Sequence, residues 1–447
     1  MSRPTTAPIE TTEPSVASIA RRARAASRAL GNLSLETRNG VLAAAAKALE
    51  EGRARILEAN KRDCRAAEAE VSAGKMTSAM LARLRTSERG IAQMAAQVRE
   101  VAGLADPLGR RLAATELDSG LVLYKESCPF GVVGVIFESR PDVIPQLASL
   151  ALKSGNAAIL KGGSEAAYTN EALVSIWREC LTGLPEVPAD SINLLQSRTD
   201  VLELLALDRD VDLIIPRGSY ALVQFIVAHS RIPVLGHSEG ICHVYVDRAA
   251  DLSKAVDITY DAKVQYPAVC NAVETLLVHE AVAGQFLPQV VAKLKEAKVE
   301  IRGDSKTAAL LPREGVLPAS EEDWATEYSD LILSIKIVGD LDEAIGHINR
   351  YGSRHTDAIV TEDAEAARRF LNEVDSAGVF HNASTRFADG YRYGLGAEVG
   401  ISTSKLHARG PMGLEGLTTY KYKLCGDGHT VGPYARGEKK FKHRRLE

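Results

Sequence analysis

The stretch GVVGVIFESRPDVIPQLASLALKSGNAAIL, residues 131–160, changes from a strand pattern to a helix pattern and back. It opens with an apolar run at 132–136, typical of a buried strand, and closes with a second at 157–160. Between them, Pro141 precedes apolar residues at helical spacing and Gly155 follows them, an arrangement typical of helix ends. The order predicts two parallel strands joined by a crossover helix.

The same alternation continues along most of the chain. Strand and helix patterns follow one another up to residue 236, and a second series after Gly240 ends in a strand pattern at 377–381. We therefore predict an α/β protein with two doubly wound domains, each built on a parallel sheet with helices on both faces. The expected boundaries are 15–236 for a nucleotide-binding domain and 237–381 for a catalytic domain.

Other segments fall outside this alternation. Residues 15–103 show helical spacing, and two short apolar runs around Asp118-Ser119-Gly120 predict a β-hairpin at 111–127, which interrupts the first domain. A late strand pattern at 417–424 needs a partner, for which the hairpin is one candidate, within the chain or across a subunit boundary. We expect the two together to form a small oligomerisation element.

Composition limits the class of protein. The chain has 447 residues, a formal net charge of −4, 45% hydrophobic residues and 25% charged residues. This balance gives no indication of a nucleic-acid or membrane partner. The six cysteines include no Cys-x-x-Cys pair, and no apolar run is long enough to span a bilayer, so we expect reduced thiols in a cytoplasmic protein. Residues 1–14 and 434–447 are expected to be flexible tails.

One cysteine occupies a distinctive place. Cys270 follows a helix pattern, lies in a predicted loop and precedes the apolar strand pattern at 273–278. A thiol held where a strand begins can meet a substrate and, as a thiolate, is a strong nucleophile. The position alone also suits a small buried apolar residue, which is how most free cysteines behave.

Two turns between a strand and a helix are candidates for binding phosphate groups. The usual Gly-x-Gly-x-x-Gly motif does not follow the first strand of the alternation. Instead, Lys161-Gly162-Gly163-Ser164 places a cation and two glycines where backbone amides and a helix start can approach an anion. Gly218 and Ser219 occupy a second such turn. Each turn alone is equally compatible with an ordinary connection.

Together these residues resemble a known family. The run at 129–136, Lys161, the Gly218-Ser219 turn and Cys270 are similar to the aldehyde dehydrogenase superfamily. Within it, four longer segments resemble the γ-glutamyl phosphate reductase family, and the resemblance extends from about residue 16 to residue 422. These segments are IFESRPD at 136–142, IPRGS at 215–219, LGHSEGICHVYVD at 235–247 and GLGAEVGIST at 394–403.

The resemblance implies the NADPH-dependent reduction of γ-glutamyl phosphate to glutamate 5-semialdehyde and phosphate, a step of proline biosynthesis. Cys270 would attack the acyl phosphate and form a thioester that accepts a hydride. The backbone N–H of Cys270 is one candidate oxyanion donor, and Ser139, at the position of the superfamily's oxyanion asparagine, is a second. Hydrolytic members carry a glutamate where this chain has Val234, which implies a reductase but also suits a core strand.

The resemblance also implies the cofactor contacts, which are Lys161, Gly163, Ser164, Gly218, Ser219 and Glu327. NAD-preferring members often carry a glutamate three residues after the lysine corresponding to Lys161, and here that position is Ser164. Without that negative charge, the 2′-phosphate of NADPH is favoured beside Lys161. Glu327 takes the place of the glutamate that holds the nicotinamide ribose, although its neighbours depart from the family pattern.

The implied substrate carries an amine, a carboxylate and a phosphate, so it needs both cationic and acidic partners. The candidates for anion contact are Arg140, Arg217 and His237, and the candidates for the amine are Glu138, Glu239 and Glu398. Each of these side chains would equally serve as a loop-orienting ion pair. The sequence shows no metal-ligand spacing, and no metal is predicted.

Two alternatives remain open. The chain could be another semialdehyde dehydrogenase of the superfamily, which Val234 and the four segments disfavour. It could also be a catalytically silent oligomeric relative, which the presence of Cys270 and Lys161 disfavours. We expect a homo-oligomer. The acyl phosphate cyclises readily and the chain has no kinase region, so a separate glutamate 5-kinase must supply it, and direct association with that kinase is a hypothesis.

Overall fold

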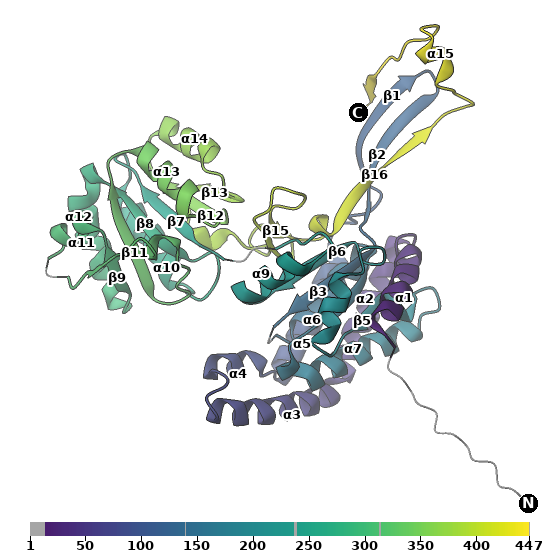
Figure 1. Ribbon diagram of the computed structural model, residues 1–447, viewed down its shortest axis with the longest axis horizontal. Helices are drawn as coiled ribbons and strands as arrows, with labels where there is room; N and C mark the ends of the chain where they lie inside the picture. Colours follow the sequence, from purple (N-terminus) through teal and green to yellow (C-terminus); the bar gives the residue numbers. More distant parts are fainter. Residues whose placement is uncertain (1–13, 139, 237–238, 313, 447) are drawn as a thin grey trace, which may run out of the picture. The chain divides into compact units, whose positions relative to one another are not determined.

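The computed structural model describes residues 14–138, 140–236, 239–312 and 314–446 (Figure 1). The chain forms two compact units. Unit 1 comprises Met1–Pro216, Ile226–Val234 and Leu417–Glu447, and unit 2 comprises Arg217–Phe225 and Leu235–Gly416. Both units are of the α/β class, which confirms the predicted fold class.

Unit 1 begins with the helical region expected from the sequence. Its helices are α1 (Val16–Leu30), α2 (Leu35–Glu51), α3 (Arg53–Ser72), α4 (Ser78–Leu84) and α5 (Glu88–Gly103). Ser15, Ser34, Thr77 and Ser87 each accept a hydrogen bond from a first-turn amide, which explains where four of them start. Among the described residues, no helix is long and apolar enough to cross a membrane.

The sheet of unit 1 confirms the alternation read from residues 131–160. Its order is β5-β4-β3-β6, with β3 and β4 pairing in parallel and every residue of both strands buried. Gly155, at φ +72°, follows the helix between them in the left-handed conformation that favours glycine. The elements are β3 (Val132–Phe137), α6 (Val143–Lys153), β4 (Ala157–Lys161), α7 (Ala167–Thr182), β5 (Ile192–Leu194), α8 (Thr199–Leu205) and β6 (Leu213–Arg217).

A second sheet of unit 1 pairs the strands of residues 111–129 with strands near the carboxyl end of the chain (Figure 1). The predicted hairpin is confirmed as β1 (Arg111–Asp118) and β2 (Leu121–Pro129), and the late strand β16 (Thr418–Cys425) pairs antiparallel with β2 within the same chain. The interpretation of 434–447 as a flexible tail is wrong in part, because β17 (Arg444–Leu446) pairs with β1. Of the other predicted tail, 1–14, only Pro14 lies among the described residues.

Unit 2 is built on a seven-stranded parallel sheet with the order β10-β9-β11-β8-β7-β12-β13. Along β7, Val244 and Val246 pack in one apolar cluster, while Tyr245 between them packs in another, so the sheet is covered on both faces. Its strands are β7 (Cys242–Val246), β8 (Val273–His279), β9 (Glu300–Gly303), β10 (Leu317–Pro318), β11 (Ile332–Val338), β12 (Thr356–Val360) and β13 (Gly378–His381).

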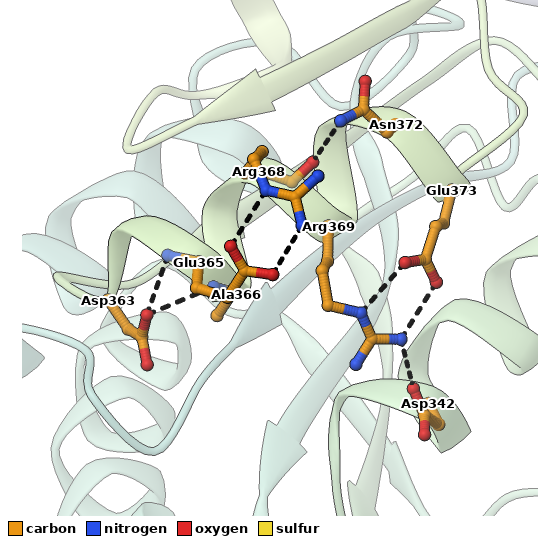
Figure 2. Close-up of polar contacts among 8 residues, drawn as sticks. All are labelled: Asp342, Asp363, Glu365, Ala366, Arg368, Arg369, Asn372 and Glu373. Carbon is orange, nitrogen blue, oxygen red and sulfur yellow. Dashed lines mark hydrogen bonds and ion pairs between the residues drawn. The ribbon is translucent and has the colours of Figure 1, made fainter.

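Helices α10 (Leu252–Val264) and α11 (Glu280–Glu296) contribute to the first cluster, and α13 (Leu341–Tyr351) and α14 (Ala364–Glu373) to the second. Figure 2 shows how α14 is attached to α13: the Arg369 guanidinium donates to Glu373 in its own helix and, at 2.6 Å, to Asp342 at the start of α13. Phe370 of α14 is buried and stacks on Tyr245 of β7, which attaches this helix to the sheet, whereas the partly exposed ion pair with Asp342 contributes little. The two helices flank β12 in sequence, and β12 pairs with β7 and β13 in the sheet.

Candidate active site

The predicted nucleophile lies at the amino-terminal edge of the unit 2 sheet. Cys270 lies in the loop between α10 and β8, three residues before the strand. Strands β8, β7 and β12 are consecutive neighbours, with Cys242 opposite Val273 and His243 opposite Asp357. Because neighbouring parallel strands begin at the same edge, residues at their starts come together. The structure therefore brings Cys270, Cys242 and His355 into contact from three segments far apart in the sequence.

His355 is a close polar neighbour of the nucleophile. It is 1% exposed, and its Nε2 atom lies 3.2 Å from Sγ of Cys270. On the other side of the ring, Nδ1 lies 2.9 Å from Oγ1 of Thr356 and 3.8 Å from Sγ of Cys242. The Cys242 thiol itself donates to the main-chain carbonyl of Cys270 at 3.3 Å. The thiol of Cys270 thus faces the Nε2 atom of an imidazole whose Nδ1 atom also has polar neighbours.

The backbone around Cys270 leaves no room for a side chain at Gly240. A Cβ atom added to Gly240 would lie 1.9 Å from the carbonyl oxygen and 2.4 Å from the Cα of Cys270. Real Cβ atoms do not approach backbone this closely, so the loop depends on glycine there. Gly240 belongs to the 235–247 segment on which the family resemblance rests.

Two buried contacts hold the Cys270 loop at either end. Lys263 in α10 and Glu274 in β8 form an ion pair at 2.6 Å, with both side chains 0% exposed. Nδ2 of Asn271 donates to the carbonyl of Ala388 at 2.8 Å, which attaches the loop to the segment after β13. The nucleophile is therefore carried by a connection with little freedom to move.

The electrostatic surroundings keep the thiol protonated. Loss of hydration on burial, together with the carboxylates of Glu327 and Glu398, raises the pKa of Cys270 to about 12, although part of the residue remains exposed. Burial also raises the pKa of Glu398, whose Oε2 accepts from the Gly390 amide at 2.8 Å. Burial and the charge of Glu327 raise the pKa of Glu239. At neutral pH the nucleophile therefore needs a base.

Several of the predicted residues lie around Cys270 in unit 2. Glu327 and Glu398 act on its charge, Glu239 is influenced by Glu327, and Arg217 lowers the pKa of Glu398. Gly218 and Ser219 lie in the same unit, in the turn between β6 and α9 (Tyr220–His229). His237, in the segment before Glu239, lies outside the described residues.

Sequence reasoning missed two residues, His355 and Arg386. Arg386 is 6% exposed, its guanidinium acts on the charge of Cys270, and its Nε donates to the Gln265 side chain at 2.9 Å. Burial lowers its pKa, as expected of a cation removed from water. No ion pair is formed by Arg386 within the described part of the chain. Neither residue belongs to a local motif, so the sequence alone offered no signal for them.

The predicted phosphate-binding turn lies in unit 1. Lys161 is the last residue of β4, it is buried, and its Nζ donates to the Gly162 carbonyl at 2.5 Å. Burial lowers the pKa of Lys161. Among the described residues this buried ammonium group donates to a main-chain carbonyl and forms no ion pair. An anionic ligand group, such as a cofactor phosphate, would therefore suit it. The carboxylate of Glu165 lies beside Gly163, however, so the turn carries a negative charge one residue after Ser164.

The expected contribution of a helix start to this turn is wrong. Helix α7 begins at Ala167, after a short 3-10 turn at Ser164–Ala166, and its first amides are already used. The amides of Tyr168 and Thr169 donate to the carboxylate of Asp63 at 3.1 and 2.7 Å. Lys161 is therefore the main source of positive charge in the segment.

The remaining candidates follow β3 in unit 1. Glu138 and Arg140 are both exposed. Ser139, the predicted second oxyanion donor, lies outside the described residues. The main-chain carbonyl of Arg140 accepts from the Val143 amide at 3.1 Å, which begins the turn into α6.

Comparison with known proteins identifies the family. The sequence model described as the aldehyde dehydrogenase family matches residues 4–310. A gamma-glutamyl phosphate reductase from a Cyanothece species is 56% identical over 99% of this chain and 99% of its own length, and one from Natronomonas pharaonis is 55% identical over 98% of each. This chain belongs to the γ-glutamyl phosphate reductases of the aldehyde dehydrogenase family. The four segments that carry the resemblance in the sequence are thus a correct indication.

Solved structures agree with this membership in the γ-glutamyl phosphate reductases. The crystal structure of gamma-glutamyl phosphate reductase from Thermotoga maritima is 42% identical to this chain, with a TM-score of 0.89, and the match covers 93% of this chain and 99% of that one. An acetylating aldehyde dehydrogenase from Geobacillus thermoglucosidasius, 16% identical, has a TM-score of 0.64 over 93% of this chain and 97% of its own. The second likeness shows the shared fold alone.

Proposed function

We propose that this γ-glutamyl phosphate reductase reduces γ-glutamyl 5-phosphate to glutamate 5-semialdehyde and inorganic phosphate, with Cys270 as the nucleophile. The observation that carries the proposal is the 56% identity, over nearly the whole chain, to an enzyme of that name. The environment of Cys270 supports it, because the thiol lies beside an imidazole and is surrounded by side chains that suit a charged substrate.

The reaction at Cys270 proceeds through a thioester. Its sulfur forms a bond to the acyl carbon, the bond between that carbon and the phosphate oxygen breaks, and phosphate leaves with the electron pair. When bound, NADPH supplies the hydride that reduces the thioester carbonyl. The carbon–sulfur bond of the resulting thiohemiacetal then breaks, which releases the aldehyde and regenerates the Cys270 thiol. The main-chain N–H of Cys270 is our first candidate to donate to the oxyanion, and Ser139 the second.

The charged side chains around Cys270 suit the substrate. Arg217 and the buried Arg386 are our candidate cations for its phosphate and carboxylate. Glu239 and Glu398 are available to its amine, and the raised pKa of each carboxyl is expected to fall when an ammonium group binds beside it. Further contacts from Glu138, Arg140 and His237 remain predictions.

For the cofactor we propose NADPH in preference to NADH. The support is Lys161, a buried cation that the 2′-phosphate would pair with, and the absence of a carboxylate at Ser164. Gly163, Gly218, Ser219 and Glu327 complete the proposed set. Assembly into a homo-oligomer through the sheet of β1, β2 and β16, a cytoplasmic location and association with glutamate 5-kinase are further parts of this proposal.

The reverse reaction tests the function. We would measure NADP⁺ reduction with glutamate 5-semialdehyde, with and without inorganic phosphate, for the wild-type protein and for Cys270→Ala. Turnover that requires phosphate and is lost in the variant supports an acyl-phosphate reductase with this nucleophile. Turnover without phosphate would mean that water accepts the acyl group, which would contradict the proposal.

A further inference from the structure

We propose that His355 is the general base that removes the proton from Cys270 as the sulfur attacks the acyl carbon. This inference rests on the proposed function and deepens it. The buried imidazole touches the reacting sulfur, and the structure holds both ring nitrogens in the positions that this role requires.

The first argument is geometric. Nε2 of His355 lies 3.2 Å from Sγ of Cys270, within the reach of a proton transfer between nitrogen and sulfur. His355 precedes the first residue of β12, which is held in the sheet by pairing with β7 and β13. Cys270 is fixed by the Lys263–Glu274 pair and by Asn271. The two reacting groups are thus held by separate rigid elements, which keeps their distance short.

The second argument concerns which ring nitrogen carries the proton. Nδ1 faces the hydroxyl of Thr356 and the sulfur of Cys242, and both can accept a hydrogen bond. The Cys242 thiol proton is directed to the Cys270 carbonyl, so this sulfur presents a lone pair to the ring. With the ring proton on Nδ1, the lone pair of Nε2 points to Cys270, whose S–H is the donor. This is the tautomer of a base.

The third argument comes from the charges around the pair. Among the described residues, the carboxylates of Glu327 and Glu398 oppose a thiolate at Cys270, and the guanidinium of Arg386 favours it. Burial and the two carboxylates prevail, so the thiol stays neutral before the substrate arrives. A resting thiolate–imidazolium pair is therefore disfavoured. The proton moves to His355 only as the carbon–sulfur bond forms.

His355 and Cys270 account for the proton on the sulfur. In the first half-reaction, the S–H proton passes to Nε2 while phosphate leaves with the electrons of the broken carbon–oxygen bond and takes a proton from water. In the second, the carbon–sulfur bond breaks with its electrons on sulfur, and the imidazolium returns the proton to Cys270. A single group thus acts as base and then as acid, as microscopic reversibility in the reverse reaction also requires.

His355→Gln tests the proposal with two readouts. The first is turnover in the phosphate-dependent reverse reaction, which should fall by about 10²–10⁴-fold with little change in KM. The second is alkylation of Cys270 by iodoacetamide, followed by peptide mass spectrometry, as a function of pH. The variant should lose the reaction at neutral pH and keep a component that rises about tenfold per pH unit, because only ionised thiol then reacts.

Controls separate this role from a structural one. His347→Gln removes another buried histidine, which contacts Lys336 rather than Cys270, and it should alkylate at the wild-type rate. Thr356→Val keeps the shape but removes the hydroxyl at Nδ1, so it should lower both turnover and alkylation by roughly tenfold. If His355→Gln does not fold, Thr356→Val decides the question.

The proposal would be overturned if His355→Gln turned over and was alkylated at the wild-type rates. If His355→Gln does not fold, the same result in Thr356→Val would overturn it. Alkylation uses no substrate, so it tests His355 even if the wild-type protein shows no phosphate-dependent turnover. In that case the proposed function would fail while the assignment of the base would still be decided.

Discussion

Replacing Lys263 by methionine should destabilise unit 2 through the carboxylate that it leaves behind. Lys263 and Glu274 are both fully buried, and their 2.6 Å ion pair links α10 to β8 across the Cys270 loop. Methionine preserves most of the side-chain volume but removes the charge. Breaking a buried pair on one side costs roughly 3–5 kcal/mol, because the carboxyl that remains is either charged without water or a partner or, below its raised pKa, protonated without its ionic partner.

A second substitution provides the matched control. In Lys263→Met/Glu274→Leu both charges are removed, and replacing a buried pair by apolar residues of similar volume is often neutral. We therefore expect the double variant to recover most of the roughly 3–5 kcal/mol lost by the single one. The amide of Ser329, which donates to Glu274 at 3.4 Å, loses its acceptor in the double variant, so the recovery should be incomplete.

The pH dependence of this loss has a definite sign. Burial raises the pKa of Glu274 from 4.5 to about 7 even beside Lys263, and removing the lysine raises it further. A carboxyl whose folded pKa exceeds its unfolded value contributes stability that is lost as the pH rises through the folded pKa. In the wild type this decline ends near pH 7. In Lys263→Met the free energy of unfolding continues to fall above pH 7, by up to about 1.4 kcal/mol per pH unit. The difference in stability between the variant and the wild type therefore grows above pH 7.

Tryptophan fluorescence can report this loss from unit 2 alone. The chain has two tryptophans, Trp177 in unit 1 and Trp324 in unit 2. In a Trp177→Phe background, urea unfolding followed by fluorescence at pH 6 and pH 8.5 would give the free energy of unfolding of unit 2 for each variant. A loss in Lys263→Met below about 1 kcal/mol, or a double variant no more stable than the single one, would refute the reasoning.

The remaining predictions concern the site. Lys161→Ala should raise KM for NADPH roughly tenfold more than KM for NADH, and equal effects in steady-state kinetics would contradict pairing with the 2′-phosphate. Arg386→Gln should raise KM for inorganic phosphate in the reverse reaction by roughly tenfold or more, whereas an unchanged KM would exclude this guanidinium as the phosphate contact. Glu398→Gln should lower the pKa of Cys270, because it removes a like charge, and iodoacetamide at pH 9 should then alkylate Cys270 faster than in the wild type. An equal or slower rate would show that the carboxylate does not act on the sulfur.

Sequence patterns within a short segment predict those helices and strands that depend mainly on the residues of the segment itself. The strand and helix of residues 131–160 and the hairpin at 111–127 follow from apolar spacing, proline and glycine. Strand β17 could not be predicted, because its two arginines make the segment look like a solvated tail. Its place depends on pairing with β1 and on the contact of Arg444 with Glu116 at 2.7 Å, far away in the sequence.

The same limit applies to the site. Cys270 and Lys161 belong to recognisable segments, so a sequence-based prediction can place them. His355 reaches Cys270 from 85 positions away, and Arg386 reaches Gln265 from 121. The use of the α7 amides by Asp63 likewise depends on a contact across 106 positions. Such partners are set by the order of strands in the sheet, which single-chain patterns do not encode.

The pairing of β2 with β16 has a consequence for how the protein is made. Lys423 contacts Glu126 across 297 residues, so on a ribosome that adds ~5–20 residues per second the hairpin waits roughly 15–60 s for its partner. During that time one edge of β2 offers unpaired main-chain groups to any other strand. The exposed edge makes nascent chains of this protein more prone to mispairing with one another than the finished molecule, and it makes the last stage of synthesis the natural moment for chaperone protection.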